Sequence, residues 1–276
     1  MDKKIIILGA KGMLGTDLAS VFSSYEPLLV DKKELDISNP KKVDDFIKKH
    51  GPEVVINAAA YTDVDGCEDN QDLCMEVNAE GPENLAKACK KNNCTLIHYS
   101  TDYIFNGQNQ EGYDENYFNI DPVNVYGESK AEGEKAIMDN CTKYYIIRIS
   151  WLYGKHGKNF VNTMLDLSKK NKELKVIDDQ NGSPTYTKDV AERTKYIVDK
   201  QRELENGVYH VTNSKSCTWY EFAKEIFKIK NIKTKLTPCT SEEYPLPATR
   251  PEFSILLNTK LPKMRTWQEA LKEYLA

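Results

Sequence analysis

The sequence predicts an α/β fold in which a doubly wound parallel sheet carries a smaller, irregular α+β lobe. Short apolar runs alternate with helical patterns through the first half of the chain. Glycines follow the first apolar run at the spacing of a phosphate-binding turn. Polar residues gather where the apolar runs end, and parallel sheets bind their ligands at that edge. The sequence therefore predicts a ligand site along one edge of the sheet.

Bulk composition argues against several classes of protein. The 276 residues are 40% hydrophobic and 29% charged, and the net charge of −4 gives no basic footprint for nucleic acid. No apolar run is long enough to cross a membrane, so we expect no membrane partner. Seven cysteines without a Cys-x-x-Cys pair indicate reduced thiols and a cytoplasmic protein. The four histidines lack ligand spacing, so no metal is predicted.

The first strand and helix frame a dinucleotide-binding turn. Residues 3–8 are a β-branched apolar run typical of a buried parallel strand. In the following GAKGMLG, Gly9 permits the tight turn, Gly12 lets the backbone approach a pyrophosphate, and Gly15 lets the helix pack on the strand. The alternative is a plain glycine turn. The residues expected at the cofactor are Gly9, Gly12, Met13 and Leu14.

An acidic residue ends the second predicted strand, residues 27–30. Asp31 lies about 20 residues after the first glycine, where a carboxylate can bind the adenosine ribose and favours NAD. Lys32 and Lys33 follow at once, and either could hold the 2′-phosphate of NADP instead. The sequence therefore predicts NADPH or NADH and leaves the preference open.

Small and hydroxyl residues end the next two predicted strands. Residues 53–60 form a strand whose end lets a ligand lie flat across the backbone, at Ala58, Ala59 and Ala60. Residues 95–100 form the following strand, which gives out at Ser100 and Thr101. Because the carboxyl ends of parallel strands share one edge, we expect the alanines to contact the cofactor and the hydroxyls to face the catalytic helix.

A tyrosine and a lysine on one helix face indicate proton transfer. Tyr126 and Lys130 are four residues apart in a helix predicted over residues 125–137. A free phenol has a pKa of about 10, and a nearby ammonium together with the positive nicotinamide would lower the pKa of such a group. We predict Tyr126 as the general acid and Lys130 as the residue that lowers its pKa and holds the nicotinamide ribose. Thr101 is predicted to donate to the carbonyl oxygen and orient it.

The same Tyr-x-x-x-Lys spacing occurs twice more in the chain. The pairs are Tyr196/Lys200 and Tyr220/Lys224. Only the pair beginning at Tyr126 follows a strand that ends in Ser-Thr and lies in the nucleotide-binding half. The other two are predicted as amphipathic helix surfaces.

A long loop and a second lobe complete the predicted fold. Residues 105–124 have no regular pattern, and a loop of this length is usually functional or mobile, so we predict a lid over the site. Beyond Ser150 the strand–helix alternation loosens. We predict a dinucleotide-binding Rossmann domain of residues 1–152 and about 186–228, with a substrate-binding lobe of about 153–185 and 229–276.

Several segments together resemble a known family. The extended short-chain dehydrogenase/reductases share the GxxGxxG turn, a strand-end Ser/Thr and Tyr-x-x-x-Lys. Within them the chain resembles the dTDP-4-dehydrorhamnose reductases from Ile5 to about Leu261, in AAAYTDVDGCE, HYSTDYIFNG, NVYGESKAEGE, RISWLYG, DQNGSPT and RPEFSIL. The resemblance implies hydride transfer from NAD(P)H to C4 of a 4-keto-6-deoxyhexose carried on dTDP, with Tyr126 protonating O4.

The resemblance also implies further site residues. Asp36 and Ile37 resemble the superfamily's adenine-contacting turn, although Asp36 could instead be a helix cap or a turn residue. Arg250 could pair with the diphosphate or form a surface ion pair. Trp151 could contact the substrate or pack between the lobes. The residues implied around the sugar or nucleotide are Thr62, Val64, Asp102, Tyr103 and Trp151.

Two other functions stay open at the level of sequence. One is a reductase or epimerase of another nucleotide sugar that uses the same Tyr-Lys pair. The other is a non-catalytic regulatory subunit resembling the β subunit of methionine adenosyltransferase. The presence of Thr101, Tyr126 and Lys130 together argues against this alternative.

Some family members bridge two subunits through magnesium and acidic residues. Asp17 aligns with the first of these acids, but its partners cannot be placed, so no metal is predicted. A homodimer is a possible assembly, and the sequence leaves the oligomeric state open.

Overall fold

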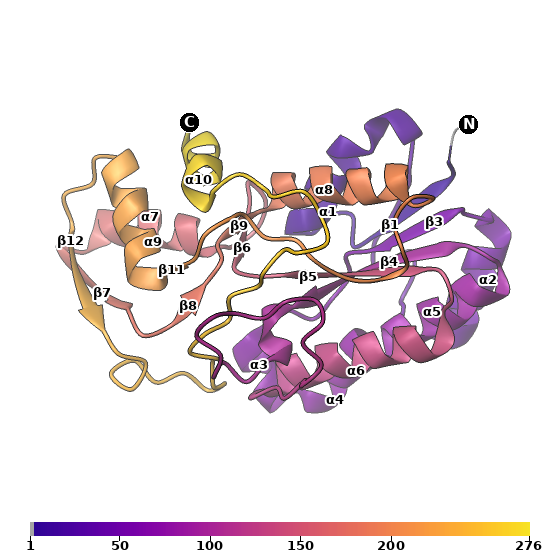
Figure 1. Cartoon of the computed structure of the whole chain (residues 1–276), viewed down its shortest axis with the longest axis horizontal. Coiled ribbons are helices and arrows are strands. Elements are labelled where there is room, and N and C mark those ends of the chain that lie inside the picture. The colour runs from indigo at the N-terminus through magenta and orange to yellow at the C-terminus, as the bar shows by residue number, and fades with distance from the viewer. Residues whose placement is uncertain (1–2) are drawn as a thin grey trace.

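A six-stranded parallel sheet forms the centre of the computed structural model, which describes residues 3–276 (Figure 1). The strand order is β10-β5-β4-β3-β1-β2, and every neighbouring pair is parallel. The predicted doubly wound sheet is therefore confirmed, and its order reverses between β1 and β3, where such sheets bind ligands. The strands are β1 (Ile5–Leu8), β2 (Leu28–Val30), β3 (Val54–Asn57), β4 (Thr95–Thr101), β5 (Tyr144–Ile149) and β10 (Gly207–His210).

Helices cover both faces of the sheet because its strands carry apolar side chains on both sides. One face carries α1 (Met13–Val21) and α8 (Thr187–Lys200), and the other carries α2 (Pro40–His50), α5 (Gly81–Lys91) and α6 (Val125–Asn140) (Figure 1). Ile5 and Ile7 pack in the first core, whereas Ile6 and Leu8 pack in the second. Short 3₁₀ turns follow α1 and β4, at Ser23–Tyr25 and Asp102–Ile104.

The helical segment between β3 and β4 is divided into four parts in the structure. Its parts are α3 (Val64–Asp69), α4 (Gln71–Met75), a π-helical turn (Glu76–Glu80) and α5. Asn70 separates α3 from α4 because its backbone leaves helical geometry, with φ −129° and ψ 51°. Within the π turn, the Asn78 side chain accepts from the Tyr61 backbone N–H at 2.9 Å and donates to the Tyr61 carbonyl at 2.9 Å. Through these two hydrogen bonds, Asn78 holds the backbone of the loop that follows β3.

A smaller lobe with its own apolar core packs beside the sheet (Figure 1). Its helices are α7 (Phe160–Lys170), α9 (Trp219–Ile229) and α10 (Trp267–Leu275). Its strands pair as β6 (Leu152–Tyr153) with β9 (Thr185–Tyr186), β7 (Glu173–Ile177) with β12 (Lys235–Cys239), and β8 (Asn181–Gly182) with β11 (Cys217–Thr218).

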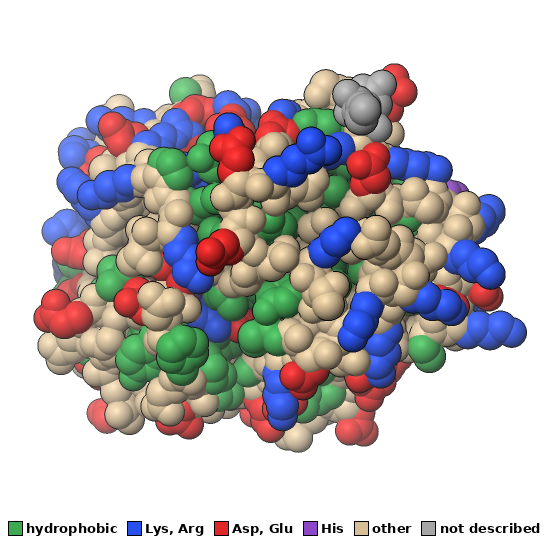
Figure 2. Space-filling model, turned by 45° about the vertical axis from the view of Figure 1, so that its right-hand side comes forward, with side chains coloured by type: hydrophobic (Ala, Val, Ile, Leu, Met, Phe, Trp, Pro, Cys, Tyr) green, Lys and Arg blue, Asp and Glu red, His purple; other side chains and the backbone are tan. Residues whose placement is uncertain are grey.

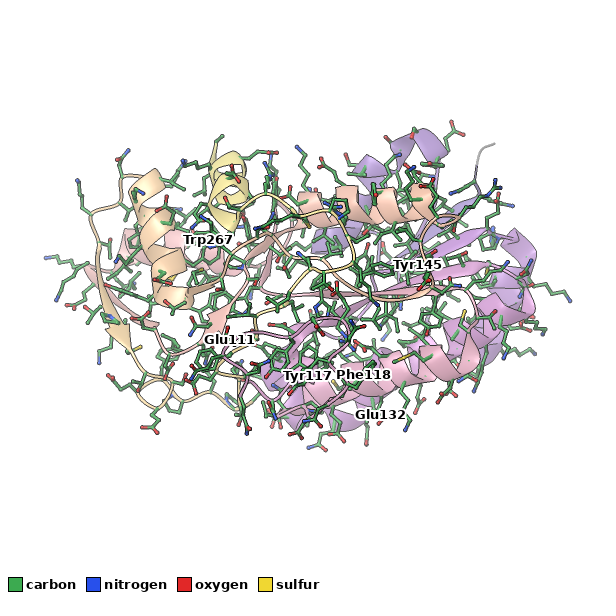
Figure 3. The ribbon with its side chains drawn as sticks, in the orientation of Figure 1. Glu111, Tyr117, Phe118, Glu132, Tyr145 and Trp267 are labelled. Carbon is green, nitrogen blue, oxygen red and sulfur yellow. The ribbon has the colours of Figure 1, made fainter. Side chains whose placement is uncertain are left out.

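Helix α9 lies in this lobe, whereas the sequence places it in the nucleotide domain. The apolar face of α9, including Phe222 and Ile226, packs against Tyr153 and Trp267 rather than against the sheet. Trp267 is the first residue of α10 (Figure 3). The remaining domain boundaries stay a prediction.

The loop over residues 105–124 is packed down instead of forming a lid. The Phe105 ring stacks on Tyr113, with ring centres 4.1 Å apart, and both side chains are fully buried. Tyr117, labelled beside α6 in Figure 3, packs against the same pair. The Tyr113 backbone N–H donates to the Ile255 carbonyl at 2.8 Å. Residues 105–124 do not contribute to the main site cavity, so the predicted lid is wrong.

The surface shows no preference for one sign of charge on the face drawn in Figure 2, where basic and acidic side chains are interspersed. Between residues 3 and 276, no helix has both the length and the apolar character needed to span a membrane. Within the same residues, no group of three or more His, Cys, Asp or Glu side chains is arranged to hold a metal ion.

Candidate active site

Two adjoining cavities lie at the carboxyl edge of the sheet. The larger, of about 440 Å³, is bordered by the ends of β3, β4 and β5 and by the start of α6. The smaller, of about 240 Å³, lies beside β1 and β2 and shares Gly12, Ala58 and Ala60 with the larger. The predicted residues on the larger cavity are Met13, Leu14, Thr62, Val64, Thr101, Asp102, Tyr103, Tyr126, Lys130 and Trp151. Those on the smaller are Gly9, Asp31, Asp36, Ile37 and Ala59.

The glycine turn has no room for side chains. Gly9 has φ +71°, and a Cβ there would lie 2.7 Å from the Ala59 backbone nitrogen. A Cβ at Gly15 would lie 2.0 Å from the Gly9 carbonyl oxygen, so only glycine lets α1 pack this closely on the turn. Gly12 is the N-cap of α1 and makes no side-chain cap, which leaves the helix N-terminus facing both cavities.

Asp31 is held ionised at the end of β2. Its carboxylate accepts from the Lys11 backbone N–H at 3.1 Å and pairs with the Lys11 ammonium at 3.0 Å. Burial acts to raise the pKa of Asp31, but these Lys11 hydrogen bonds outweigh it and lower the pKa below its usual range. Lys32 borders the same cavity, so both features that left the cofactor preference open are present.

Asp36 is both a turn residue and a neighbour of the cofactor cavity. Its carboxylate accepts from the Ser38 backbone N–H at 3.2 Å and from the Ser38 hydroxyl at 2.9 Å, as in an Asx turn. Ile37 is buried and packs close to Gly81 at the start of α5. The two readings of Asp36 are therefore compatible.

The start of α6 is pressed against the end of β4. The Asn124 side chain caps the helix by accepting from the Gly127 backbone N–H at 2.7 Å. A Cβ at Gly127 would lie 2.1 Å from the Tyr103 carbonyl oxygen, so glycine permits this approach. The rings of Tyr103 and Tyr126 meet edge to face, with centres 5.9 Å apart. Tyr126 thereby stands beside the strand end that carries Thr101.

Lys130 lies fully inside the protein. Its ammonium group donates to the Tyr99 carbonyl at 2.6 Å and lies 3.2 Å from His98 Nε2. Burial lowers the pKa of Lys130 to about 8, partly opposed by Glu134. Burial also raises the pKa of Tyr126, and this influence exceeds every other. A net lowering of the Tyr126 pKa is therefore not seen in this structure, because burial outweighs the influences that act to lower it.

Thr101 is engaged with its neighbour. Its hydroxyl donates to Asp102 Oδ1 at 3.0 Å and accepts from the Tyr103 backbone N–H at 3.2 Å. Asp102 also accepts from the Ser150 hydroxyl at 2.8 Å. Burial raises the pKa of Asp102 to about 6, against the lowering effect of hydrogen bonds from Ser254, Ser150 and Thr101. Thr101 therefore directs its proton toward the carboxylate.

Trp151 joins the two lobes. Its indole stacks on Trp219 of α9, with ring centres 3.5 Å apart, and its backbone has φ +44°. Both indoles border the main cavity, and Trp219 also borders a third cavity of about 350 Å³. Trp151 thus packs between the lobes and also borders the main cavity, and its contact with the substrate stays a prediction.

Arg250 forms a partly buried ion pair with Asp65. Its guanidinium binds both oxygens of Asp65, at 2.7 and 2.8 Å. This bidentate bond is the largest influence on Asp65 and lowers the pKa of its carboxyl. Arg250 lies on the third cavity rather than on the main one. The ion-pair reading is therefore observed, and contact with a diphosphate stays a proposal.

Several cavity residues were not predicted. Lys158 and Trp219 border the main cavity, together with Ser150 and Leu152. The RISWLYG and GKHGKNF segments are local signals that could have indicated Ser150, Leu152 and Lys158. Trp219 gave no such signal, because it reaches the site only through the packing of α9.

The residues present fit a dinucleotide. The glycine turn, the ionised Asp31 and the run of alanines all border the smaller cavity. The Ser100 hydroxyl is buried on the main cavity without a hydrogen-bond partner, which leaves it free to bind a ligand there.

The doubly wound sheet, the GxxGxxG turn and the Tyr126/Lys130 pair beside a strand-end hydroxyl define an extended short-chain dehydrogenase/reductase. The chain belongs to the family described as the RmlD substrate binding domain, whose family model matches residues 3–276.

Relatives match over nearly the whole chain. The chain is 39% identical to the spore coat polysaccharide biosynthesis protein SpsK of Bacillus subtilis (strain 168), over 99% of this chain and 96% of that protein. It is 39% identical to a dTDP-4-dehydrorhamnose reductase of Aggregatibacter actinomycetemcomitans, over 98% and 97%. A crystal structure of dTDP-4-dehydrorhamnose reductase from Bacillus anthracis str. Ames in complex with NADP is 40% identical, with a TM-score of 0.95 and coverage of 100% and 99%.

Proposed function

We propose that this chain is an NAD(P)H-dependent oxidoreductase that reduces the C4 ketone of dTDP-4-dehydro-L-rhamnose to dTDP-L-rhamnose. The observation that carries this proposal is that Gly12 of the dinucleotide turn and Tyr126 border the same main cavity. The relatives named as dTDP-4-dehydrorhamnose reductases support the choice of substrate.

Tyr126 is the proton donor in this proposal. A bound reduced nicotinamide supplies the hydride to the carbonyl carbon. Tyr126 gives its phenolic proton to O4 as negative charge develops there. Because burial raises the pKa of Tyr126, the residue keeps its proton at neutral pH until an alkoxide more basic than itself forms beside it. Lys130, buried one helical turn away, provides positive charge next to the tyrosinate that results.

Thr101 positions groups in this site rather than donating to the ketone. Above pH 6 or so its proton is directed to the ionised Asp102, so the Thr101 oxygen offers the cavity only a lone pair. That lone pair can accept from the Tyr126 hydroxyl or from a sugar hydroxyl. Asp102 and Ser150, bonded at 2.8 Å, form the wall behind it.

The third cavity suits the nucleotide part of the substrate. It adjoins the main cavity across Tyr103 and Trp219, and Phe160 and Tyr244 add apolar and aromatic surface. Arg250 borders this space with its guanidinium oriented by Asp65, so a diphosphate there would approach a fixed cation. Thr62 and Val64 border the main cavity, where the sugar would lie.

A coupled assay tests the activity. Purified protein should oxidise NADPH or NADH when dTDP-4-dehydrorhamnose is supplied, and assaying each cofactor separately measures the preference that Asp31 and Lys32 leave open. The Tyr126→Phe variant should lose at least about 100-fold in kcat with unchanged cofactor binding, because only the proton donor is removed. Tyr196→Phe is the matched control, since Tyr196 begins another Tyr-x-x-x-Lys pair on the exposed surface of α8.

Other outcomes of this assay point to other functions. Turnover of a different 4-keto nucleotide sugar, with no turnover of dTDP-4-dehydrorhamnose, would keep the chemistry and replace the substrate. Normal turnover by Tyr126→Phe would refute the proposed acid. Absence of turnover together with a stable stoichiometric complex with a synthetase would favour the regulatory-subunit alternative.

The assembly state and the cellular location of the protein are also proposals. We infer a cytoplasmic protein from its seven cysteines, all free thiols although the Cys67 and Cys74 sulfurs lie 2.8 Å apart. A homodimer is proposed from the family resemblance alone. Light scattering on the purified protein would measure the dimer, and fractionation of cells would locate the protein.

A further inference from the structure

A chain of buried polar side chains lies behind Lys130. Asn57 at the end of β3 and His98 in β4 are register partners in the sheet. Asn57 Nδ2 lies 3.1 Å from His98 Nδ1, and His98 Nε2 lies 3.2 Å from Lys130 Nζ. The three side chains are each at most 2% exposed. Solvent therefore has little part in setting the direction of these hydrogen bonds.

The backbone fixes the direction of the chain at Asn57. The Ala59 N–H donates to Asn57 Oδ1 at 3.1 Å. A backbone N–H is always a donor, so the oxygen of the amide must face Ala59. The NH₂ group of Asn57 must then face His98. Turning the amide around would place two donors against each other at Ala59 and would leave a buried N–H unsatisfied.

This direction determines which ring nitrogen of His98 carries the proton. Because Asn57 donates to Nδ1, that nitrogen is the acceptor, and the neutral imidazole carries its proton on Nε2. The Nε2–H then points at Lys130 Nζ. An ammonium has three donors and no acceptor, so this arrangement opposes the charged form of Lys130. A neutral amine satisfies both contacts, since it can donate to the Tyr99 carbonyl and accept from His98.

We propose that Asn57 and His98 are positioning residues for Lys130: Asn57 holds the imidazole with its proton on Nε2, and that proton makes the ammonium of Lys130 easier to deprotonate. The proposal deepens the proposed function and rests on it, since Lys130 matters here as the charge beside Tyr126. Its consequence is a lysine that changes charge close to physiological pH. Burial acts in the same direction, and both the Lys130 and the His98 pKa lie below their usual values.

No other ionisable group around Lys130 has the influence proposed for His98 on the protonation of this lysine. Glu134, one turn further along α6, is bound by both Nε and Nη2 of Arg148, at 2.9 and 2.7 Å. That pair neutralises Glu134, which therefore offsets the burial of Lys130 only in part. The remaining ionisable neighbours are Cys74 of α4 and Tyr126 on the same helix. His98 is the group that points a donor at Nζ.

Nuclear magnetic resonance of the protein without substrate tests the proposal directly. Long-range ¹H–¹⁵N spectra distinguish the two histidine tautomers, and His98→Gln identifies the His98 signals among the four histidines. We expect the Nε2–H tautomer at pH 7. In protein labelled with ¹³C at lysine Cε, the signal missing from Lys130→Met should titrate below the other lysines.

Substitution of Asn57 separates the proposed effect from burial. Asn57→Leu removes the donor without adding charge, so His98 can move its proton to Nδ1 and accept from the ammonium. We expect the Lys130 titration to move up by at least about one pH unit, a tenfold change in proton affinity. Asn78→Leu is the matched control, because Asn78 is a buried amide that donates to Ser129, next to Lys130, without facing His98. If Asn57→Leu does not fold, His98→Leu should also move the Lys130 titration upward, since no donor would then face Lys130 Nζ.

The outcomes are separable from the fate of the proposed function. An Nδ1–H tautomer in the native protein overturns the proposal, as does a Lys130 titration that stays in place in the folded variants. An equal shift in Asn78→Leu would also overturn it by showing a general packing effect. These spectra need no turnover, so they remain informative if the protein proves inactive on dTDP-4-dehydrorhamnose. In an active enzyme, the alkaline limb of the kcat profile should move upward with the Lys130 titration.

Discussion

At the scale of single residues, burial decides the chemistry of the site. Tyr126, Lys130 and Asp102 lie within one cavity wall, and burial is the largest influence on the pKa of each. It raises the pKa of the two acids and lowers that of the lysine, because it disfavours whichever form is charged. At neutral pH, Tyr126 therefore keeps its proton, Asp102 is largely ionised and Lys130 holds its proton less tightly than a free lysine. A protonated Tyr126 is suited to general acid catalysis.

The raised pKa of Asp102 predicts how the free energy of unfolding changes with pH. Its pKa is about 6 in the folded protein and about 3.8 when unfolded, so the folded state binds the proton more tightly. The stabilisation from that proton is fully present below about pH 4 and is lost as the pH rises through 6. Relative to Asp102→Asn, wild-type protein should lose up to about 1.4 kcal/mol of unfolding free energy per pH unit across this window. Urea unfolding at several pH values measures the difference, and a flat or rising difference would contradict it.

At the scale of elements, a segment's partners decide whether it moves. The loop of residues 105–124 has the length and composition of a lid, but it buries aromatic rings against residues 252–257. Glu115 adds a further tie by accepting from the backbone N–H groups of His210 and Thr259, each at 3.2 Å. Buried rings and satisfied backbone groups make such a loop part of the folded core.

Removing one ring from this loop should destabilise the whole protein. Tyr113 is fully buried, so Tyr113→Ala should cost about 3–5 kcal/mol in the free energy of unfolding, through lost burial and the cavity left behind. Phe118→Ala in the same loop should change stability by about 0.5 kcal/mol or less, because Phe118 is 85% exposed. Urea unfolding compares the two. If a protease cleaves this loop in the wild-type protein, and cleavage stops when cofactor and substrate bind, the loop would act as a lid after all.

At the scale of the whole molecule, the site depends on contact between the lobes. The Trp151–Trp219 stack joins the sheet edge to α9, and the Arg250–Asp65 pair joins the C-terminal segment to α3. Both contacts border cavities that the proposed function assigns to the substrate. Residues of the dinucleotide turn, in contrast, belong to the sheet domain alone.

Disturbing the indole stack should therefore affect the substrate and spare the cofactor. A Cβ at Gly182 would lie 2.3 Å from Trp151 Cε2, so Gly182→Ala must displace the indole. We expect KM for the dTDP sugar to rise about tenfold or more, which corresponds to about 1.4 kcal/mol, with unchanged dissociation constants for NADPH and NADH. Gly51→Ala is the control: its Cβ meets open space, and its φ of +52° predicts a loss of stability only. If Gly182→Ala weakened cofactor binding as much as substrate binding, the cofactor site would also depend on the contact between the lobes.

The sequence by itself determined the sheet, the glycine turn and the choice of Tyr126/Lys130 over two other pairs. These features depend on residues close together in the chain, where apolar runs and fixed spacings carry the information. The tertiary structure decided what depends on distant segments: the packing of α9 with the smaller lobe, Trp219 on Trp151, and Asn57 on His98. It also reversed the expected pKa effect at Tyr126, because burial is a property of the folded molecule and cannot be obtained from residue spacing.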